Sequence, residues 1–407
     1  MLAIALMLNG ESDPAPPTAR FSEADVARVA KRVERMRGLR FERPVRPRFL
    51  GREEALEFVQ EVSRKDYPER RRRIDDEGLK LLGLLRPSTD LGAAIESVDE
   101  EQLLGFYDDR SRRLVVIREP GATRPLLEIT LAHELVHALE DQRFGLDGDE
   151  GLPDDSVLAE AALAEGTATA LMVDYADRYL SVGDVLDLAN VPDSGKLPQF
   201  LERLLLFPYI EGAKFIGEFR GESGEWGPID SIYRFRRPLS SEQILHPRRY
   251  ALGERPERVR VPSLAGVLGN DWQRLRATTL GEYDLRLLFD LVGGTRPAGA
   301  AEGWAGGRYE LWRRGPLDES CRAPCIERDV ALIRVRWDTP GERAEAEREF
   351  VKVWEKGLDG RRLGGRAKAW VWSSRGGAIM MRGSGRETTA VLAPDVRTAA
   401  RALAAGP

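Results

Sequence analysis

The stretch Leu131–Leu139 constrains this chain more than any other, because it places two histidines and a glutamate on one predicted helix. It lies inside the run Leu126–Phe144, which contains no proline and is predicted to be a single helix. His133 and His137 are four positions apart, so their imidazoles project from the same face and both reach one ion. Glu134 completes the H-E-x-x-H pattern, in which two neutral imidazoles hold zinc and the carboxylate takes a proton from a metal-activated water.

The hydrophobic pattern turns this face of the helix toward the interior. One stripe of i, i+3, i+4 and i+7 spacing includes both histidines: Leu126, Ile129, Thr130, His133, Val136, His137 and Glu140. The chain contains only 3 histidines, so chance produces the pattern about once in several hundred shuffled chains. The alternative interpretation is a pair of core histidines whose ring nitrogens bond to neighbouring backbone groups.

A zinc site needs at least one more protein ligand, and a second predicted helix offers a carboxylate. In the run Asp155–Tyr175, Glu165 lies at the centre of an otherwise apolar stripe, where an unpaired carboxylate is costly and requires a partner. If the two helices pack antiparallel across the loop Gly145–Pro153, the side chains of His137 and Glu165 reach a similar height. The alternative partner of Glu165 is an arginine, and the alternative ligand is Glu160, which lies off the stripe.

This arrangement resembles the gluzincin class of zinc metallopeptidases, and the pair of helices is similar to the small soluble forms called minigluzincins. The resemblance implies zinc ligation by His133, His137 and Glu165, with Glu134 as the general base. Three downstream segments are also similar to recurring segments of uncharacterised bacterial proteins with the same pattern: Phe207–Gly212, Pro238–Pro247 and Gly303–Tyr309.

One position departs from the gluzincin pattern. Many gluzincins have an aspartate four residues after the glutamate ligand, where it orients a histidine, but this chain has Thr169. A threonine hydroxyl accepts an imidazole N–H without adding charge. Asp141, one turn beyond His137, offers a substitute, and the alternative for Asp141 is a solvated surface carboxylate.

Length and composition predict a soluble globular protein of two or three domains, and the expected helices and strands place it in the α+β class. The chain has 407 residues, of which 42% are hydrophobic, and its net charge of −5 argues against a nucleic-acid surface. We expect a terminal segment at 1–20 and a mainly helical zincin-like catalytic domain with a small β-hairpin at 21–260. A separate α+β module at 261–407 is expected to wall or cap the cleft. Beyond the first residues the sequence offers no transmembrane candidate.

Periodicity places the elements within these domains. Helices are expected at 21–40, 52–62, 69–85, 126–144, 155–175, 280–291 and 341–357, and from 394 onward. Extended segments are expected at 45–50, 308–313, 329–337, 368–373, 378–382 and 388–392, and a loop at 221–237.

The N-terminal residues and the cysteines bear on localisation. Met1–Leu8 is almost wholly apolar, too short to span a bilayer, and followed by the linker-like Asn9–Pro17. It is either the remnant of a signal peptide or a disordered end. We favour the former and expect a periplasmic or secreted protein, with a cytoplasmic location as the alternative. In an exported protein Cys321 and Cys325 form a local disulfide, whereas the alternative is two reduced thiols.

A β-hairpin is predicted immediately before the zinc helix. Gly105–Ile117 contains two extended runs around the turn Asp108–Ser111. In gluzincins the strand that borders the cleft pairs with extended peptide substrate, and by resemblance Leu114–Ile117 or its partner strand binds substrate backbone. The alternative is a buried two-stranded element that packs under the helix.

A tetrahedral intermediate of peptide hydrolysis needs a hydrogen-bond donor for its oxyanion. His246 is the only histidine outside the pattern, and Pro247 favours an extended conformation that presents its ring to the cleft. Protonated His246 or the hydroxyl of Tyr250 or Tyr209 is therefore a candidate donor. The alternative for His246 is a packed loop histidine.

The sequence thus predicts a zinc-dependent hydrolase that cleaves peptide bonds in a peptide or protein substrate, with Glu134 as the general base. The alternative is a non-catalytic peptide-binding or protein-binding module on a metallopeptidase scaffold. The intact Glu134 disfavours that alternative, and Thr169 favours it.

Overall fold

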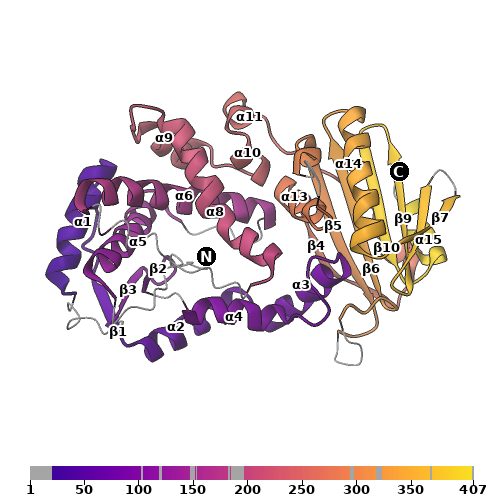
Figure 1. The fold of residues 1–407 in the computed structure, drawn as a ribbon, viewed down its shortest axis with the longest axis horizontal. Helices are drawn as coiled ribbons and strands as arrows, with labels where there is room; N and C mark the ends of the chain where they lie inside the picture. Colours follow the sequence, from indigo (N-terminus) through magenta and orange to yellow (C-terminus); the bar gives the residue numbers. More distant parts are fainter. Residues whose placement is uncertain are drawn as a thin grey trace. The chain divides into compact units, whose positions relative to one another are not determined.

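The structure is a computed structural model that describes residues 21–101, 104–118, 122–146, 152, 154–181, 184, 197–293, 298–317, 323–366 and 369–405. The chain forms two compact units (Figure 1). Unit 1 comprises Met1–Glu69, Gly92–Leu152 and Ala159–Pro238, and unit 2 comprises Arg70–Leu91, Pro153–Leu158 and Leu239–Pro407. The main boundary therefore falls at Pro238 rather than near residue 260, and unit 2 also takes in two earlier segments of the chain.

Unit 1 is mainly helical. Its helices are α1 (Glu23–Arg37), α2 (Arg52–Asp66), α4 (Leu91–Glu101), α5 (Arg124–Phe144), most of α6 (Asp154–Tyr179), α8 (Gln199–Arg220) and α9 (Gly227–Phe235). Its strands are β1 (Pro47–Leu50), β2 (Gly105–Asp108) and β3 (Arg113–Ile117). The expected loop at 221–237 is therefore wrong over α9, where Pro228 occupies a first-turn position and Ile229, Ile232 and Tyr233 are buried.

Local side chains fix where the helices of unit 1 begin. Ser22 caps α1 by accepting a hydrogen bond from the Asp25 N–H, and the Asp25 carboxylate accepts from the Ser22 N–H in return. Thr123 caps α5 in the same way at Leu126, and Pro125 occupies a first-turn position of α5. These caps start the helices within a few residues of the predicted positions.

The sheet of unit 1 has the strand order β1-β3-β2. β3 is the central strand, since it pairs with β1 in parallel and with β2 antiparallel, so β2 lies at the edge. The predicted hairpin is confirmed, and β2 and β3 lie beside α5 (Figure 1). One hydrophobic cluster joins α1, β3, α5 and α6 through residues such as Val29, Leu114, Leu135 and Leu171.

Unit 2 is built on an antiparallel sheet of seven strands in the order β4-β5-β6-β10-β9-β8-β7. The strands are β4 (Trp272–Thr278), β5 (Trp304–Arg314), β6 (Asp329–Trp337), β7 (Arg361–Arg366), β8 (Ala369–Ser374), β9 (Gly377–Ser384) and β10 (Glu387–Ala393). Its helices are α3 (Glu69–Leu81), α10 (Ser241–Leu245), α11 (Pro247–Leu252), α12 (Ala265–Leu268), α13 (Glu282–Asp290), α14 (Pro340–Lys352) and α15 (Val396–Ala404), with shorter turns η1 (Ala298–Ala301) and η2 (Val353–Gly357).

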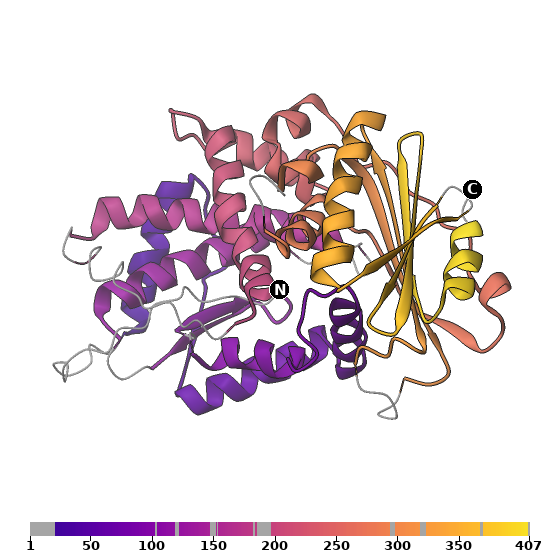
Figure 2. The same ribbon diagram turned by 45° about the vertical axis from the view of Figure 1, so that its right-hand side comes forward.

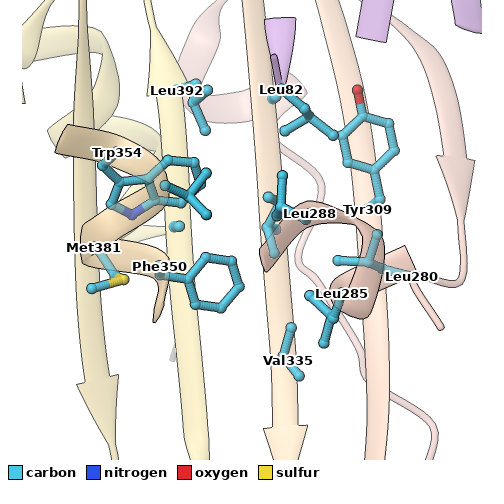
Figure 3. Packing of buried hydrophobic residues seen from close by; sticks show 14 of the residues in the cluster. Leu82, Leu280, Leu285, Leu288, Tyr309, Val335, Phe350, Trp354, Met381 and Leu392 are labelled. Carbon is cyan, nitrogen blue, oxygen red and sulfur yellow. The ribbon is translucent and has the colours of Figure 1, made fainter. Parts of the chain in front are cut away.

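Alternating side chains divide the core of unit 2 between the two faces of this sheet. One face packs against α13 and α14 through large apolar residues that include Leu288, Phe350, Trp354 and Met381 (Figure 3). The other face packs against α12 and α15 through smaller residues such as Ala399. Figure 2 shows α14 crossing one side of the sheet and α15 on the other.

The predicted α+β class is confirmed, with a helix-rich first part and a sheet-rich C-terminal part. The edge strands β4 and β7 were not predicted. The expected terminal segment at 1–20 and Cys321 lie outside the described residues, and Cys325 is disulfide-bonded. In the described part of the chain, α6 alone is long and apolar enough to cross a membrane by length and composition, and 61% of its most apolar window is buried inside the structure.

Candidate metal centre

Helix α5 carries the two histidines through the interior of unit 1. Every residue from Leu127 to Asp141 is buried, so this helix is covered on all sides and not along one stripe alone. His133 and His137 are each 3% exposed, and Glu134 is 2% exposed. Three polar side chains on a buried helix require partners, and the neighbouring helix and strand supply them.

Helix α6 runs antiparallel to α5, as the sequence predicts. The Tyr175 hydroxyl, late in α6, donates to Glu128 near the start of α5 at 2.7 Å. At the other end, the Tyr233 hydroxyl lies 2.6 Å from Glu140 Oε2 and 3.4 Å from the Leu163 carbonyl, so Glu140 and Leu163 lie close together. Glu165 therefore faces the histidine pair from the opposite helix.

Three donor atoms converge between the helices. Glu165 Oε2 lies 3.0 Å from His133 Nε2 and 3.3 Å from His137 Nε2. The two Nε2 atoms are 3.1 Å apart. The predicted meeting of His133, His137 and Glu165 is confirmed, and the partners of Glu165 in the described residues are imidazoles and not the alternative arginine.

The spacing of these atoms fits a divalent metal ion. In a tetrahedral zinc site with bonds of about 2.0–2.1 Å, neighbouring ligand atoms lie about 3.3 Å apart. The three observed separations are 3.0, 3.1 and 3.3 Å. Two imidazoles and one carboxylate are also a ligand set that zinc takes in catalytic sites. The residues present therefore fit zinc.

The charges of the cluster depend on one another. Burial lowers the pKa of His137, but the Glu165 carboxylate outweighs burial and raises the pKa of this imidazole to about 9. Burial opposes ionisation of Glu165, yet the two histidines hold the pKa of its carboxyl well below the usual range. A metal ion that binds here therefore displaces a proton from the cluster, as is usual for histidine ligands.

Glu134 lies beside the cluster and is held by the sheet. Its Oε2 accepts a hydrogen bond of 2.7 Å from the backbone N–H of Tyr107 in the edge strand β2. Burial raises the pKa of Glu134, and the two neighbouring histidines lower it. The sequence gives the hairpin but no sign that its Tyr107 amide reaches Glu134; the one available signal is that the hairpin immediately precedes α5.

The second ring nitrogen of each histidine lacks a hydrogen bond from Thr169 or Asp141, the two residues that the sequence offers for this role. His133 Nδ1, His137 Nδ1 and Thr169 Oγ1 are buried and have no hydrogen-bond partner within the described ranges. Thr169 therefore accepts no imidazole N–H within the described residues, so the departure from the gluzincin pattern leaves the histidines without support from this position. Asp141 is neither a substitute nor solvated: it is 4% exposed and accepts hydrogen bonds from the Tyr107 hydroxyl and the Leu146 N–H.

A buried ionic network supports α5 one turn beyond His137. The side chains of Arg37 and Glu140 are both 0% exposed, and Arg37 Nε lies 3.1 Å from Glu140 Oε1. Arg37 also pairs with Asp230 of α9 at 2.6 Å, and Glu140 accepts the Tyr233 hydroxyl. This network ties α1 and α9 to α5, and the sequence offered no signal for it.

Helix α8 comes close to Glu165 because glycines face each other. A β-carbon on Gly166 would lie 2.3 Å from the backbone carbon of Gly212, and one on Gly212 would lie 2.1 Å from the Ala162 carbonyl oxygen. Three residues before Gly212, the Tyr209 ring stacks on His133 with 6.1 Å between ring centroids. Of the three predicted oxyanion donors, Tyr209 is the one that unit 1 brings to the histidine pair.

His246 and Tyr250 belong to unit 2. His246 separates α10 from α11, and its Nε2 lies 3.0 Å from both carboxylate oxygens of Glu282. Tyr250 is 3% exposed within α11. The fully extended conformation predicted before Pro247 is not present at His246, whose φ is −126° and ψ 72°, and its ring is bound to Glu282.

A second group of acidic side chains lies in unit 2 and consists of Glu242, Glu254 and Asp338. Arg249 already lies among them, with Nη1 at 2.8 Å from Glu242, 3.7 Å from Glu254 and 3.1 Å from Asp338. A guanidinium therefore supplies the positive charge that these carboxylates require.

Comparison with known proteins bears on unit 2 alone. A family model described as "Domain of unknown function (DUF8575)" matches residues 271–403, from the start of β4 into α15. No curated protein and no solved structure matches the chain. The candidate metal centre lies outside the matched residues.

Proposed function

We propose that the protein is a zinc-dependent peptidase of the gluzincin type, with His133, His137 and Glu165 as metal ligands and Glu134 as general base. The observation that carries this proposal is the convergence of three buried donor atoms at separations of 3.0 to 3.3 Å. Three protein ligands are the number that catalytic zinc sites use, because a fourth position then serves water or substrate.

When bound, a zinc ion would polarise a scissile carbonyl and lower the pKa of a water molecule from about 15.7 to about 7. The chain itself supplies the proton transfers. Glu134 takes a proton from the attacking water while the water oxygen forms a bond to the carbonyl carbon and the C=O π electrons move to the carbonyl oxygen. The C–N bond then breaks, and Glu134 returns the proton to the leaving amine nitrogen. The Tyr107 N–H supports this role because it fixes one carboxylate oxygen of Glu134.

The strand that receives the substrate in this proposal is β2. Of the two strands that the resemblance indicates, Leu114–Ile117 and its partner, β3 is excluded because it is central and both of its edges are taken, which leaves the partner strand β2. β2 is the edge strand, and its Tyr107 N–H points away from β3 toward Glu134. An extended peptide that adds to this edge lies next to the general base, which favours main-chain recognition of a peptide or protein substrate.

Tyr209 is the oxyanion donor that the proposal favours. Its ring stacks on His133 at an interplanar angle of 20°, which brings this tyrosine beside one of the proposed metal ligands. A single such donor contributes about 3 kcal/mol to transition-state stabilisation.

The second candidate is a non-catalytic module on the same scaffold that binds a peptide or protein, with or without zinc. The two imidazole Nδ1 atoms favour it, because both lack a partner in the described part of the chain and metal-ligating histidines usually donate from that nitrogen. For either function we propose an extracytoplasmic location. The disulfide at Cys325 supports this location, because such bonds persist in oxidising compartments.

The test measures zinc content and peptide cleavage of the full-length protein on a peptide library. The proposal predicts about one zinc per chain, loss of cleavage on removal of zinc with a chelator, and recovery when zinc is restored. Cleavage that persists without metal contradicts the mechanism. Bound zinc without cleavage of any peptide identifies the binding module instead.

A further inference from the structure

Tyr107 fastens the edge strand β2 to α5 at two points. Its backbone N–H donates to Glu134 Oε2 at 2.7 Å, and its hydroxyl donates to Asp141 Oδ2 at 2.8 Å. Glu134 and Asp141 are seven positions apart, which is about 10 Å along a helix. One residue therefore spans about two turns of the helix that carries the metal ligands.

The Asp141 end of this link is rigid. The Asp141 side chain is 0% exposed, and its other oxygen accepts the Leu146 N–H at 3.2 Å. Arg112 Nε lies 3.6 Å from the oxygen that receives the Tyr107 hydroxyl. Burial and the bond to Asp141 raise the pKa of Tyr107, so the phenol stays protonated and remains a donor.

The Glu134 end depends on where the strand lies. β2 has only four residues, Gly105–Asp108, and among the described residues it pairs in the sheet with β3 alone. A short edge strand is weakly held by its own ladder, so contacts to α5 determine where the Tyr107 N–H lies. We propose that Tyr107 is a positioning residue for the general base: its hydroxyl, bound to Asp141, holds the backbone N–H that orients the Glu134 carboxylate. This inference rests on the proposed role of Glu134.

The chain offers a matched control for the hydroxyl. Tyr175 also donates a buried phenol bond, of 2.7 Å, to a carboxylate of α5, in this case Glu128. Tyr175 contributes no bond to Glu134 and lies on α6. Tyr175→Phe therefore removes a similar hydrogen bond from the same helix without releasing the β2 strand.

The experiment compares Tyr107→Phe and Tyr175→Phe in the full-length, zinc-loaded protein by residue-resolved hydrogen exchange and by peptide cleavage. In Tyr107→Phe the backbone amide of residue 107 is expected to exchange at least about 10-fold faster. The Ile117 amide, which donates to the Leu104 carbonyl, should exchange at an unchanged rate. We expect kcat to fall by about 10-fold or more, with zinc content unchanged, because misplaced catalytic groups lower the rate steeply. Tyr175→Phe is expected to change neither amide exchange at position 107 nor kcat.

Two results overturn the inference: unchanged amide exchange at position 107 in Tyr107→Phe, or the same fall in kcat in both variants. A wild-type protein that cleaves no peptide defeats the proposed function instead. In that case amide exchange still decides whether the Tyr107 hydroxyl holds the N–H at Glu134, because this readout needs no substrate.

Discussion

His133 Nε2 lies 3.0 Å from Glu165 Oε2, although the two residues are 32 positions apart on separate helices. This contact joins α5 to α6 at the point where a metal ion would bind. Loss of a residue that hydrogen-bonds to a metal ligand typically weakens metal binding by roughly 10- to 100-fold. Glu165→Gln is expected to weaken zinc binding by more than that, because it removes a charged ligand itself. Calorimetric titration and metal analysis measure the change.

Glu160→Gln is the matched control for this prediction, since Glu160 lies on the same helix and outside the cluster. Zinc affinity in Glu160→Gln should equal that of the wild type. Equal affinity in both glutamine variants would remove Glu165 from the ligand set.

The glycine contact between α6 and α8 gives a second prediction. Gly212→Ala places a β-carbon 2.1 Å from the Ala162 carbonyl oxygen, so the helices must separate beside Glu165. We expect a loss of about 1–3 kcal/mol in the free energy of unfolding, together with weaker zinc binding. Gly217→Ala, also in α8, meets nothing within 4 Å and should be neutral or slightly stabilising. Chemical denaturation measures both variants, and equal stability would contradict the close packing.

The buried ion pair behind α5 gives a third prediction. Arg37→Ala leaves Glu140 without its cation in a site where both side chains are 0% exposed, and should cost about 3–5 kcal/mol of unfolding free energy. Arg28→Ala removes a pair with Glu128 in which the arginine is 35% exposed, and should cost about 1 kcal/mol or less. Denaturant titration distinguishes the two. If Arg37→Ala lowers the free energy of unfolding by less than Arg28→Ala does, the buried Arg37 pair contributes little to stability.

The stability of unit 2 should fall as pH rises. Burial raises the pKa of Asp155 from 3.8 to about 6, although Ser241 donates to its carboxylate. A raised pKa in the folded state means that the stabilisation is complete below about pH 4 and is lost as pH rises through about 6. For this group the loss amounts to at most about 3 kcal/mol.

Asp155→Asn tests this pH dependence, because the amide still accepts from the Ser241 N–H but cannot ionise. The fall in melting temperature between about pH 4 and pH 8 should be smaller in the variant than in the wild type. Tryptophan fluorescence measures the melting temperature of unit 2, since every tryptophan except Trp226 lies in that unit. An identical pH profile in both proteins would exclude Asp155 as the cause.

The ligand cluster could be predicted from sequence because its information is local. The spacing of His133 and His137 fixes their common face on a helix, and the apolar stripe around Glu165 marks a buried carboxylate that needs a partner. An antiparallel helix pair then leaves little freedom in how the three side chains meet. Short strands rich in β-branched and apolar residues, such as β6 and β10, were predicted because this composition is also local information.

The supports of the cluster could not be predicted, because they depend on contacts between distant segments. Arg37 and Glu140 are 103 positions apart, and neither residue type marks a buried pair in sequence. The Tyr107 bond to Glu134 comes from a backbone N–H, which every residue except proline has. The division into units is equally non-local. Helix α3 belongs to unit 2, although the chain that follows it passes through unit 1 before it returns to unit 2.

The central claim is that Glu134 removes a proton during peptide cleavage at a zinc site formed by His133, His137 and Glu165. Glu134→Gln keeps the size of the side chain and an oxygen that accepts the Tyr107 N–H, but cannot act as a base. The most direct measurement is the rate of peptide cleavage by the wild type and by Glu134→Gln, with zinc content determined in both. The account predicts equal zinc and a rate lower by at least about 100-fold in the variant. Equal rates in the two proteins would contradict it.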